Sequence, residues 1–239
     1  MKLDRYFYSI SGGIFLLLTF WGFQAFYLHG RNSDGNPIAP KMFVLDSIHG
    51  AAMSAWVLLF LVQAVLIGVR NRRLHMKLGW AALAIAPVLA ICGILTAFRS
   101  VQSQPDFFIF AMPYPGFLLV MFTEIAFYTA FVAAGLITRK RPTIHRPMML
   151  LASLSILSGS TARIPILHRV FGDAGWPGLF GPVFVLGGVL LVIRYFLTRK
   201  PDRPFAVGYA AMAAVYIVAC HFALTQTWNH LATAMLKPN

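Results

Sequence analysis

The chain has 239 residues, of which 59% are hydrophobic and only 11% are charged, and its formal net charge is +13. A soluble domain of this size does not need so much apolar surface, and repeated apolar runs of about 20 residues are typical of helices that cross a bilayer. The positive charge does not indicate a nucleic-acid partner, because basic residues in short loops orient membrane helices and contact anionic lipid headgroups. Composition therefore predicts a polytopic α-helical membrane protein.

Seven apolar segments are long enough to be membrane-spanning helices, and short loops join them. No connecting stretch is long enough to form a separate domain, so we expect residues 1–239 to fold as a single bundle of about seven transmembrane helices. The first segment follows Lys2 and Arg5 and lacks a small-residue cleavage site, which predicts a retained helix. The segments are approximately 8–28, 44–69, 79–98, 115–137, 147–170, 179–198 and 205–230.

Basic residues are divided unevenly between the two ends of such a bundle. With the N-terminus in the cytoplasm, 14 of the 20 Lys and Arg residues fall on the cytoplasmic side and the other six on the outer side. Because cytoplasmic loops carry the excess of Lys and Arg, this division predicts an N-terminus inside and a C-terminus outside. We expect such a protein in the plasma membrane, which in a bacterium is the inner membrane.

The stretch 46–63, DSIHGAAMSAWVLLFLVQ, opens the second expected span with two ionisable residues. Ionisable residues inside a membrane helix indicate a functional site. Asp46 lies one turn before His49, so it can accept the Nδ1 hydrogen of that imidazole or cap the helix. At helical spacing, one face of the stretch carries Asp46, His49, Met53, Trp56, Phe60 and Gln63.

Glu124 is the one acidic residue that lies well inside an expected span, and Arg163 lies in the next span along the chain. A rise of ~1.5 Å per residue places the carboxylate ~13 Å and the guanidinium ~10 Å below the outer surface. One interpretation is an ion pair that joins the two helices. The other is a carboxylate that moves protons or contacts a ligand.

Five of the histidines divide into an outer and an inner group. His49, His168 and His221 belong to the outer third of their spans, whereas His75 and His145 open spans on the inner side. Bis-histidine ligation of haem b requires two opposed imidazoles at matched depth. We expect His49 and His221 to form that pair, with His168 as the substitute ligand. The favoured interpretation of the inner two is structural, as contacts to lipid phosphate or helix caps.

The inner histidines also belong to a weak internal sequence repeat. RNRRLH, ending at His75, and RKRPTIH, ending at His145, each close a basic loop, and the following helices end in GILTAFR and GSTAR. Duplicated helix pairs are common in membrane folds, and unrelated hairpins can share such features. Both explanations stay open at this point.

The His49–Gly50 pair on an aromatic helix and His75 in the string RLHMKLGW are similar to features of known membrane cytochromes. In these the chain resembles b-type cytochromes of the cytochrome b561 and ferric-reductase kind, over its second to fifth spans. The resemblance implies electron transfer across or into the membrane and a redox partner or a larger membrane complex. It also implies haem b ligation by His49, His75, His145 and His221.

Two other classes of function stay open. In a metal-dependent membrane hydrolase, His49 and His221 would bind the metal, but nine residues separate His221 from His230. That spacing turns a helix by about 180°, unlike the H-x-x-x-H pair of such enzymes. The other class is a non-enzymatic transporter, small-ligand receptor or accessory subunit, and discontinuous helices with central polar residues would favour transport.

Overall fold

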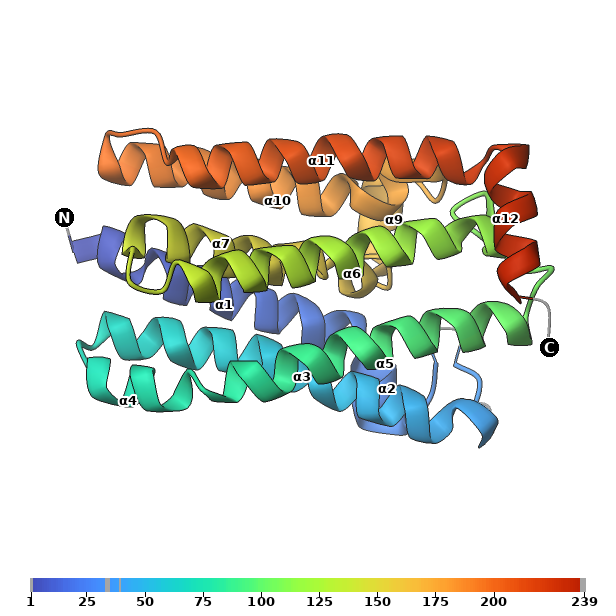
Figure 1. Ribbon diagram of the computed structural model, residues 1–239, viewed down its shortest axis with the longest axis horizontal. Coiled ribbons are helices and arrows are strands. Elements are labelled where there is room, and N and C mark those ends of the chain that lie inside the picture. The colour runs from blue at the N-terminus through green and yellow to red at the C-terminus, as the bar shows by residue number, and fades with distance from the viewer. Residues whose placement is uncertain (1, 33–34, 39, 237–239) are drawn as a thin grey trace.

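The computed structural model describes residues 2–32, 35–38 and 40–236, and almost all regular structure in these ranges is helical (Figure 1). The long helices are α1 (Lys2–Gly22), α3 (Pro40–Gly68), α5 (Ala81–Ser103), α6 (Tyr114–Ile137), α10 (Gly175–Thr198) and α11 (Arg203–Ala223). The shorter ones are α2 (Gln24–His29), α4 (Arg72–Leu78), α7 (Pro142–Ser155), α8 (Ser158–Thr161), α9 (Pro165–Phe171) and α12 (Gln226–Leu236). Two short strands, β1 (Phe108–Ile109) and β2 (Met112–Pro113), form an antiparallel hairpin.

The helices are suited to a membrane, and the all-α class predicted from composition is confirmed. Five helical segments are long and apolar enough to cross a bilayer: Pro40–Gly68, Arg72–Ser103, Tyr114–Ile137, Gly175–Thr198 and Arg203–Ala223. The bent pair Pro142–Thr161 and Pro165–Phe171 makes a sixth if it counts as one span. The outward faces of α10 and α11 expose large apolar side chains such as Val185, Val207 and Val218. Such faces fit lipid rather than water.

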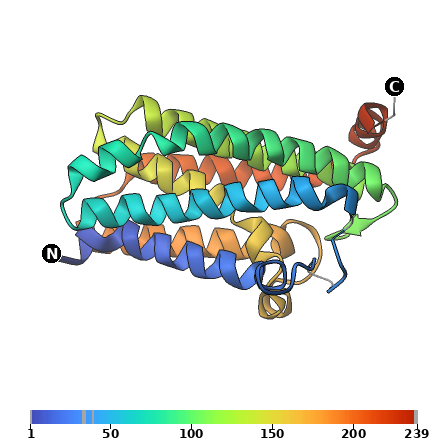
Figure 2. The same ribbon diagram turned by 90° about the horizontal axis from the view of Figure 1, so that it is seen from below.

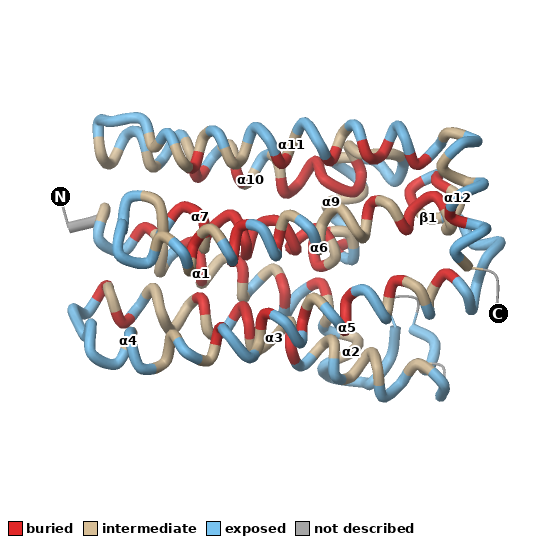
Figure 3. Tube along the Cα trace, viewed as in Figure 1, coloured by how far each residue is buried: buried red, intermediate tan, exposed pale blue. Residues whose placement is uncertain are grey.

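The long helices lie side by side, with the N-terminus and α12 at opposite ends (Figure 1). Helix α6 packs against α5, α7 and α11, while α3 packs against α1 and α5. Buried residues gather on the faces that the helices turn toward one another (Figure 3). Helix α12 lies across the end of the bundle and is seen nearly end-on in Figure 2.

One end of the bundle gathers most of the positive charge. The connections α3–α4, α6–α7 and α10–α11 lie at the same end as the N-terminus (Figure 1). We call this end, with the basic residues of these three connections and the turns beside them, the basic end. These residues are Arg70, Arg72, Arg73, Lys77, Arg139, Lys140, Arg141, Arg146, Arg194, Arg199, Lys200 and Arg203.

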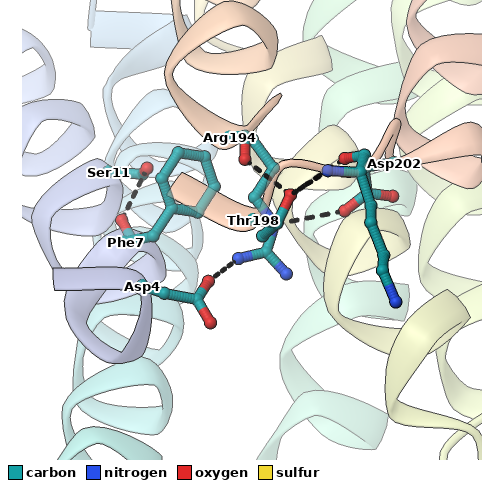
Figure 4. A network of polar contacts seen from close by, with 7 residues as sticks. Asp4, Phe7, Ser11, Arg194, Thr198 and Asp202 are labelled. Atoms are coloured by element: carbon teal, nitrogen blue, oxygen red, sulfur yellow. Dashed lines mark hydrogen bonds and ion pairs between the residues drawn. The ribbon is translucent and has the colours of Figure 1, made fainter. Parts of the chain in front are cut away.

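Arg194 ties three helices together at the basic end (Figure 4). Its guanidinium donates to the carboxylate of Asp4 on α1 and, at 3.3 Å, to that of Asp202 just before α11. Asp202 also caps α11 by accepting the backbone N–H of Phe205 at 3.3 Å. Because Arg194 has two carboxylates as partners, its charge is compensated inside the protein.

Three expected spans are divided, shortened or bent in the structure. The first, 8–28, is divided at Phe23 between α1 and α2, and the last, 205–230, ends at Ala223, where the chain turns into α12. The fifth, 147–170, is not continuous, because α9 leaves α7–α8 at 97°. Ile164 is extended at this bend, with φ −95° and ψ 109°. A residue before proline avoids the helical conformation, which explains the bend at Pro165.

Gly22 and Gly13 of α1 provide a matched test of helix packing. A Cβ at Gly22 would collide with the carbonyl oxygen of Ser160 in α8, whereas one at Gly13 would meet nothing within 4 Å. We expect Gly22→Ala to lower the free energy of unfolding by about 1–3 kcal/mol. Gly13→Ala should be neutral or stabilising by about 0.5–1 kcal/mol. Unfolding in detergent measures both, and equal effects would contradict the close approach of α1 and α8.

Candidate functional site

His75 and His145 come together at the basic end of the bundle. Their ring centres are 6.4 Å apart and their ring planes meet at 84°. His75 lies on α4 and His145 in the first turn of α7, and both side chains are half-buried. Each histidine follows a basic loop that reverses the chain, so two helical hairpins bring the imidazoles to the same level.

The two imidazoles are held in the same way. His75 Nδ1 lies 3.3 Å from the carbonyl oxygen of Gln63 on α3, and His145 Nδ1 lies 2.8 Å from that of Gly135 on α6. Since a carbonyl can only accept, Nδ1 carries the hydrogen and Nε2 keeps a free lone pair. Neither Nε2 has a hydrogen-bond partner among the described residues. This is the arrangement of an imidazole that binds a metal through Nε2.

Gln63, whose backbone carbonyl holds His75, also carries a side-chain amide. Its amide atoms Nε2 and Oε1 are both buried and find no hydrogen-bond partner in the described chain. Gly79, four residues after His75, packs against the same amide, since a Cβ there would lie 3.8 Å from Nε2 of Gln63. A buried polar group without a partner costs about 1–3 kcal/mol, so the orphaned amide fits a ligand-binding position.

Positive charge surrounds the imidazole pair. Arg72 and Arg146 both lie within electrostatic range of His75, and both are exposed. Neither of these two guanidiniums forms an ion pair with a carboxylate of the described residues. The pair of imidazoles is therefore flanked by uncompensated positive charge.

His49 and His221 are not brought into an opposed arrangement. His49 of α3 faces α5 and α6, because a Cβ at Gly93 of α5 would lie 3.6 Å from its Cε1 and 3.2 Å from Ile125 of α6. The buried Nδ1 of His49 has no partner among the described residues. His221 is exposed on α11. Helix α3 packs chiefly on α1 and α5, whereas α11 packs on α6, α7 and α10. The two histidines thus belong to different parts of the bundle.

His168 and Trp56 are both engaged in packing. His168 Nε2 donates to the carbonyl oxygen of Ala162 at 2.7 Å, and its ring stacks on Phe110 with centres 5.8 Å apart. Trp56 is 1% exposed, and its Nε1 donates to Ser153 Oγ of α7 at 3.2 Å. Its ring meets Tyr128 of α6 edge-on at 4.9 Å, so Trp56 joins helices in the core.

Arg163 is the centre of the outer polar residues. Its charge lies within electrostatic range of Asp46, His49 and Glu124. The guanidinium donates to the carbonyl oxygen of Gly159 and lies 4.6 Å above the ring of Phe23. The structure thus brings these four predicted polar residues to one region, on the side of the bundle opposite to the basic end.

Glu124 is bound to the break between α7 and α8. The hydroxyl of Ser158 donates to its carboxylate, and Tyr216 and Cys220 of α11 lie within electrostatic range. A direct ion pair between Glu124 and Arg163 stays a prediction. Carboxylate, hydroxyl and guanidinium groups of three segments meet around an interrupted helix.

Sequence reasoning placed Gln63 on the polar face of its helix but did not connect it with His75, and it missed the hydroxyl groups of the break. Five hydroxyl residues of the string SLSILSGST are buried: Ser153, Ser155, Ser158, Ser160 and Thr161. Their density shortly before Pro165 is the signal that indicates an interrupted helix, because hydroxyls can satisfy backbone groups that a break sets free.

Comparison of the chain with protein-family models, with curated proteins and with solved structures finds no match. Function is therefore inferred from geometry. Among the described residues, no group of three or more His, Cys, Asp or Glu is placed to hold a metal ion.

Ser158→Ala tests the bond at the break. The substitution leaves the carboxylate of Glu124 without its hydrogen-bond donor inside the bundle, so we expect a loss of about 1–3 kcal/mol in the free energy of unfolding. Ser103→Ala is the control, because Ser103 is exposed and bonds only to Ser100 of its own helix. Its effect should stay within about 0.5 kcal/mol. Equally small effects in denaturant unfolding would contradict the assignment.

Proposed function

We propose that this chain is a membrane electron-transfer protein that binds one haem b between His75 and His145. The imidazole pair carries the proposal. Two imidazoles that bind one metal atom from opposite sides, with bonds of about 2 Å, have ring centres roughly 6 Å apart. The ring centres of this pair are 6.4 Å apart, and each Nδ1 is fixed on a carbonyl.

The number of protein ligands favours haem over a bare metal ion. Structural and catalytic zinc sites use three or four protein ligands. The described chain offers no cluster of that size, and this also weighs against a metal-dependent hydrolase. Haem iron has four ring nitrogens of its own and needs only two axial ligands. The orphaned amide of Gln63 and the basic surroundings also fit a large polar group here.

Bound haem would supply one-electron transfer, and the chain supplies its position. His75 and His145 would hold the group through their Nε2 atoms. The carbonyl groups of Gln63 and Gly135 orient the two rings, and by accepting the Nδ1 hydrogens they make each Nε2 a stronger donor. The proposal keeps the likeness to b-type cytochromes but assigns the ligands to the inner histidines instead of His49 and His221.

The proposal includes a seven-span topology with the basic end in the cytoplasm. Helix α1 and the segment α7–α9 would add two spans to the five long apolar helices. The N-terminus lies at the basic end, and α12 lies at the opposite end (Figure 1). With the basic loops inside, the haem would lie near the cytoplasmic face of the plasma membrane, which in a bacterium is the inner membrane. A redox partner in the cytoplasm could reach it there.

Haem binding is tested by the absorption spectrum of protein purified from a haem-replete host. We expect a Soret band near ~410–430 nm. His75→Ala and His145→Ala should each remove or strongly shift it, because each removes an axial ligand. His49→Ala and His221→Ala are matched controls that remove an imidazole elsewhere and should leave the band unchanged. A colourless wild-type protein, or a band that survives loss of both inner histidines, would overturn the proposal.

A second candidate function, proton or solute transport, is favoured by the interrupted helix. In the bilayer, backbone outside regular helix is tolerated where it is buried in protein or lines a polar site. Interrupted helices with a central carboxylate are typical of transporters. The α7–α9 segment is bent by 97° and its hydroxyl at Ser158 binds Glu124.

Proton flux into reconstituted vesicles tests this second function. Wild-type protein should carry a flux above that of protein-free vesicles, and Glu124→Gln should reduce it to that background. Glutamine can still accept the Ser158 hydrogen bond but does not exchange a proton. His221→Gln, on the exposed face of α11, is the control and should keep the flux. Equal flux in wild type and Glu124→Gln would exclude the transport role.

A further inference from the structure

Two arginines flank the imidazole pair at the basic end. Arg72 is the first residue of α4 and precedes His75 by three positions, so both lie on one face of that helix. Arg146 directly follows His145 on α7. Both guanidiniums lie within electrostatic range of His75. Each hairpin thus supplies one arginine and one imidazole.

Neither arginine has its charge compensated within the described chain. The acidic residues on this side, Asp4 and Asp202, are both bound to Arg194. Arg72 and Arg146 are exposed, at the point where the half-buried imidazoles approach the surface. An anion held at this point would therefore meet two unoccupied guanidiniums.

We infer that Arg72 and Arg146 bind the two carboxylates of the cofactor and so select a dicarboxylate macrocycle. This inference rests on the proposed haem function. It adds the orientation of the macrocycle, whose carboxylates would point toward the basic end and whose apolar edge would point into the bundle. A guanidinium matches a carboxylate with two parallel hydrogen bonds, so each contact fixes orientation as well as adding binding free energy. Lipid phosphate is the competing anion for the same charges.

The test uses protein from a haem-deficient host in neutral detergent without anionic lipid. It is titrated with ferric protoporphyrin IX and with the dimethyl ester, which lacks both charges, and the Soret band reports binding. Wild-type protein should bind the free acid at least about tenfold more tightly than the ester, since about 1.4 kcal/mol corresponds to tenfold.

The variants assign that preference to the two arginines. Arg72→Gln and Arg146→Gln should each weaken binding of the free acid by about tenfold and leave binding of the ester unchanged, which also shows that the variants are folded. The double variant should bind both compounds alike. Arg199→Gln, at the same end but directly after α10, is the control and should behave as wild type.

The outcomes separate the inference from the proposed function. If wild-type protein binds acid and ester equally, or if the double variant keeps the preference for the acid, the arginines do not bind the carboxylates, whereas haem binding stands. If wild-type protein binds neither compound, the proposed function fails and the inference fails with it.

Discussion

A bilayer offers no water to hydrogen-bond, and so the polar groups of this bundle must find partners within the protein. Most of them do. Trp56 donates to Ser153, Tyr216 donates to the carbonyl oxygen of Ser155, and Arg194 binds two carboxylates. Exceptions among the described residues include the amide of Gln63, Nδ1 of His49 and the hydroxyl groups of Ser9 and Tyr128. Gln63 is the one of these whose carbonyl also holds His75, and the inner imidazole pair is therefore the centre of the functional proposal.

The pair depends on two hairpins of the same design. Helix α3 turns into α4 and helix α6 turns into α7, and in each case a histidine of the second helix donates Nδ1–H to a carbonyl near the end of the first. The basic loops fix the level of the turn, and the carbonyls fix the rings.

The sequence was sufficient for the class of protein but not for the pairing of its histidines. Apolar runs predict membrane helices directly, because burial in lipid depends on composition and length. Pairing His49 with His221 relied on matched depth, and depth along a helix does not report which helices are neighbours. That is decided by packing, which places α5 and α6 against His49 and leaves His221 exposed.

The interrupted helix was missed, and the inner histidines were interpreted as structural or, through the resemblance alone, as haem ligands. The average hydropathy of 147–170 hides a break that Pro165 and five hydroxyl residues produce. Histidines among Arg and Lys resemble residues that face lipid headgroups, and only the path of the chain shows that Gln63 and Gly135 provide carbonyls for them. Asp46, His49, Glu124 and Arg163 were all singled out from the sequence, because ionisable residues in apolar spans are easily recognised.

Electron paramagnetic resonance of the ferric protein tests the proposed ligation most directly, because it reports both the ligands and the angle between their planes. If both imidazoles hold the iron, it would be low-spin, and their ring planes at 84° would give the highly anisotropic signal of perpendicular rings. We predict that signal in the wild-type protein. A high-spin signal, or the absence of any haem signal from protein made in a haem-replete host, would contradict a haem held between His75 and His145.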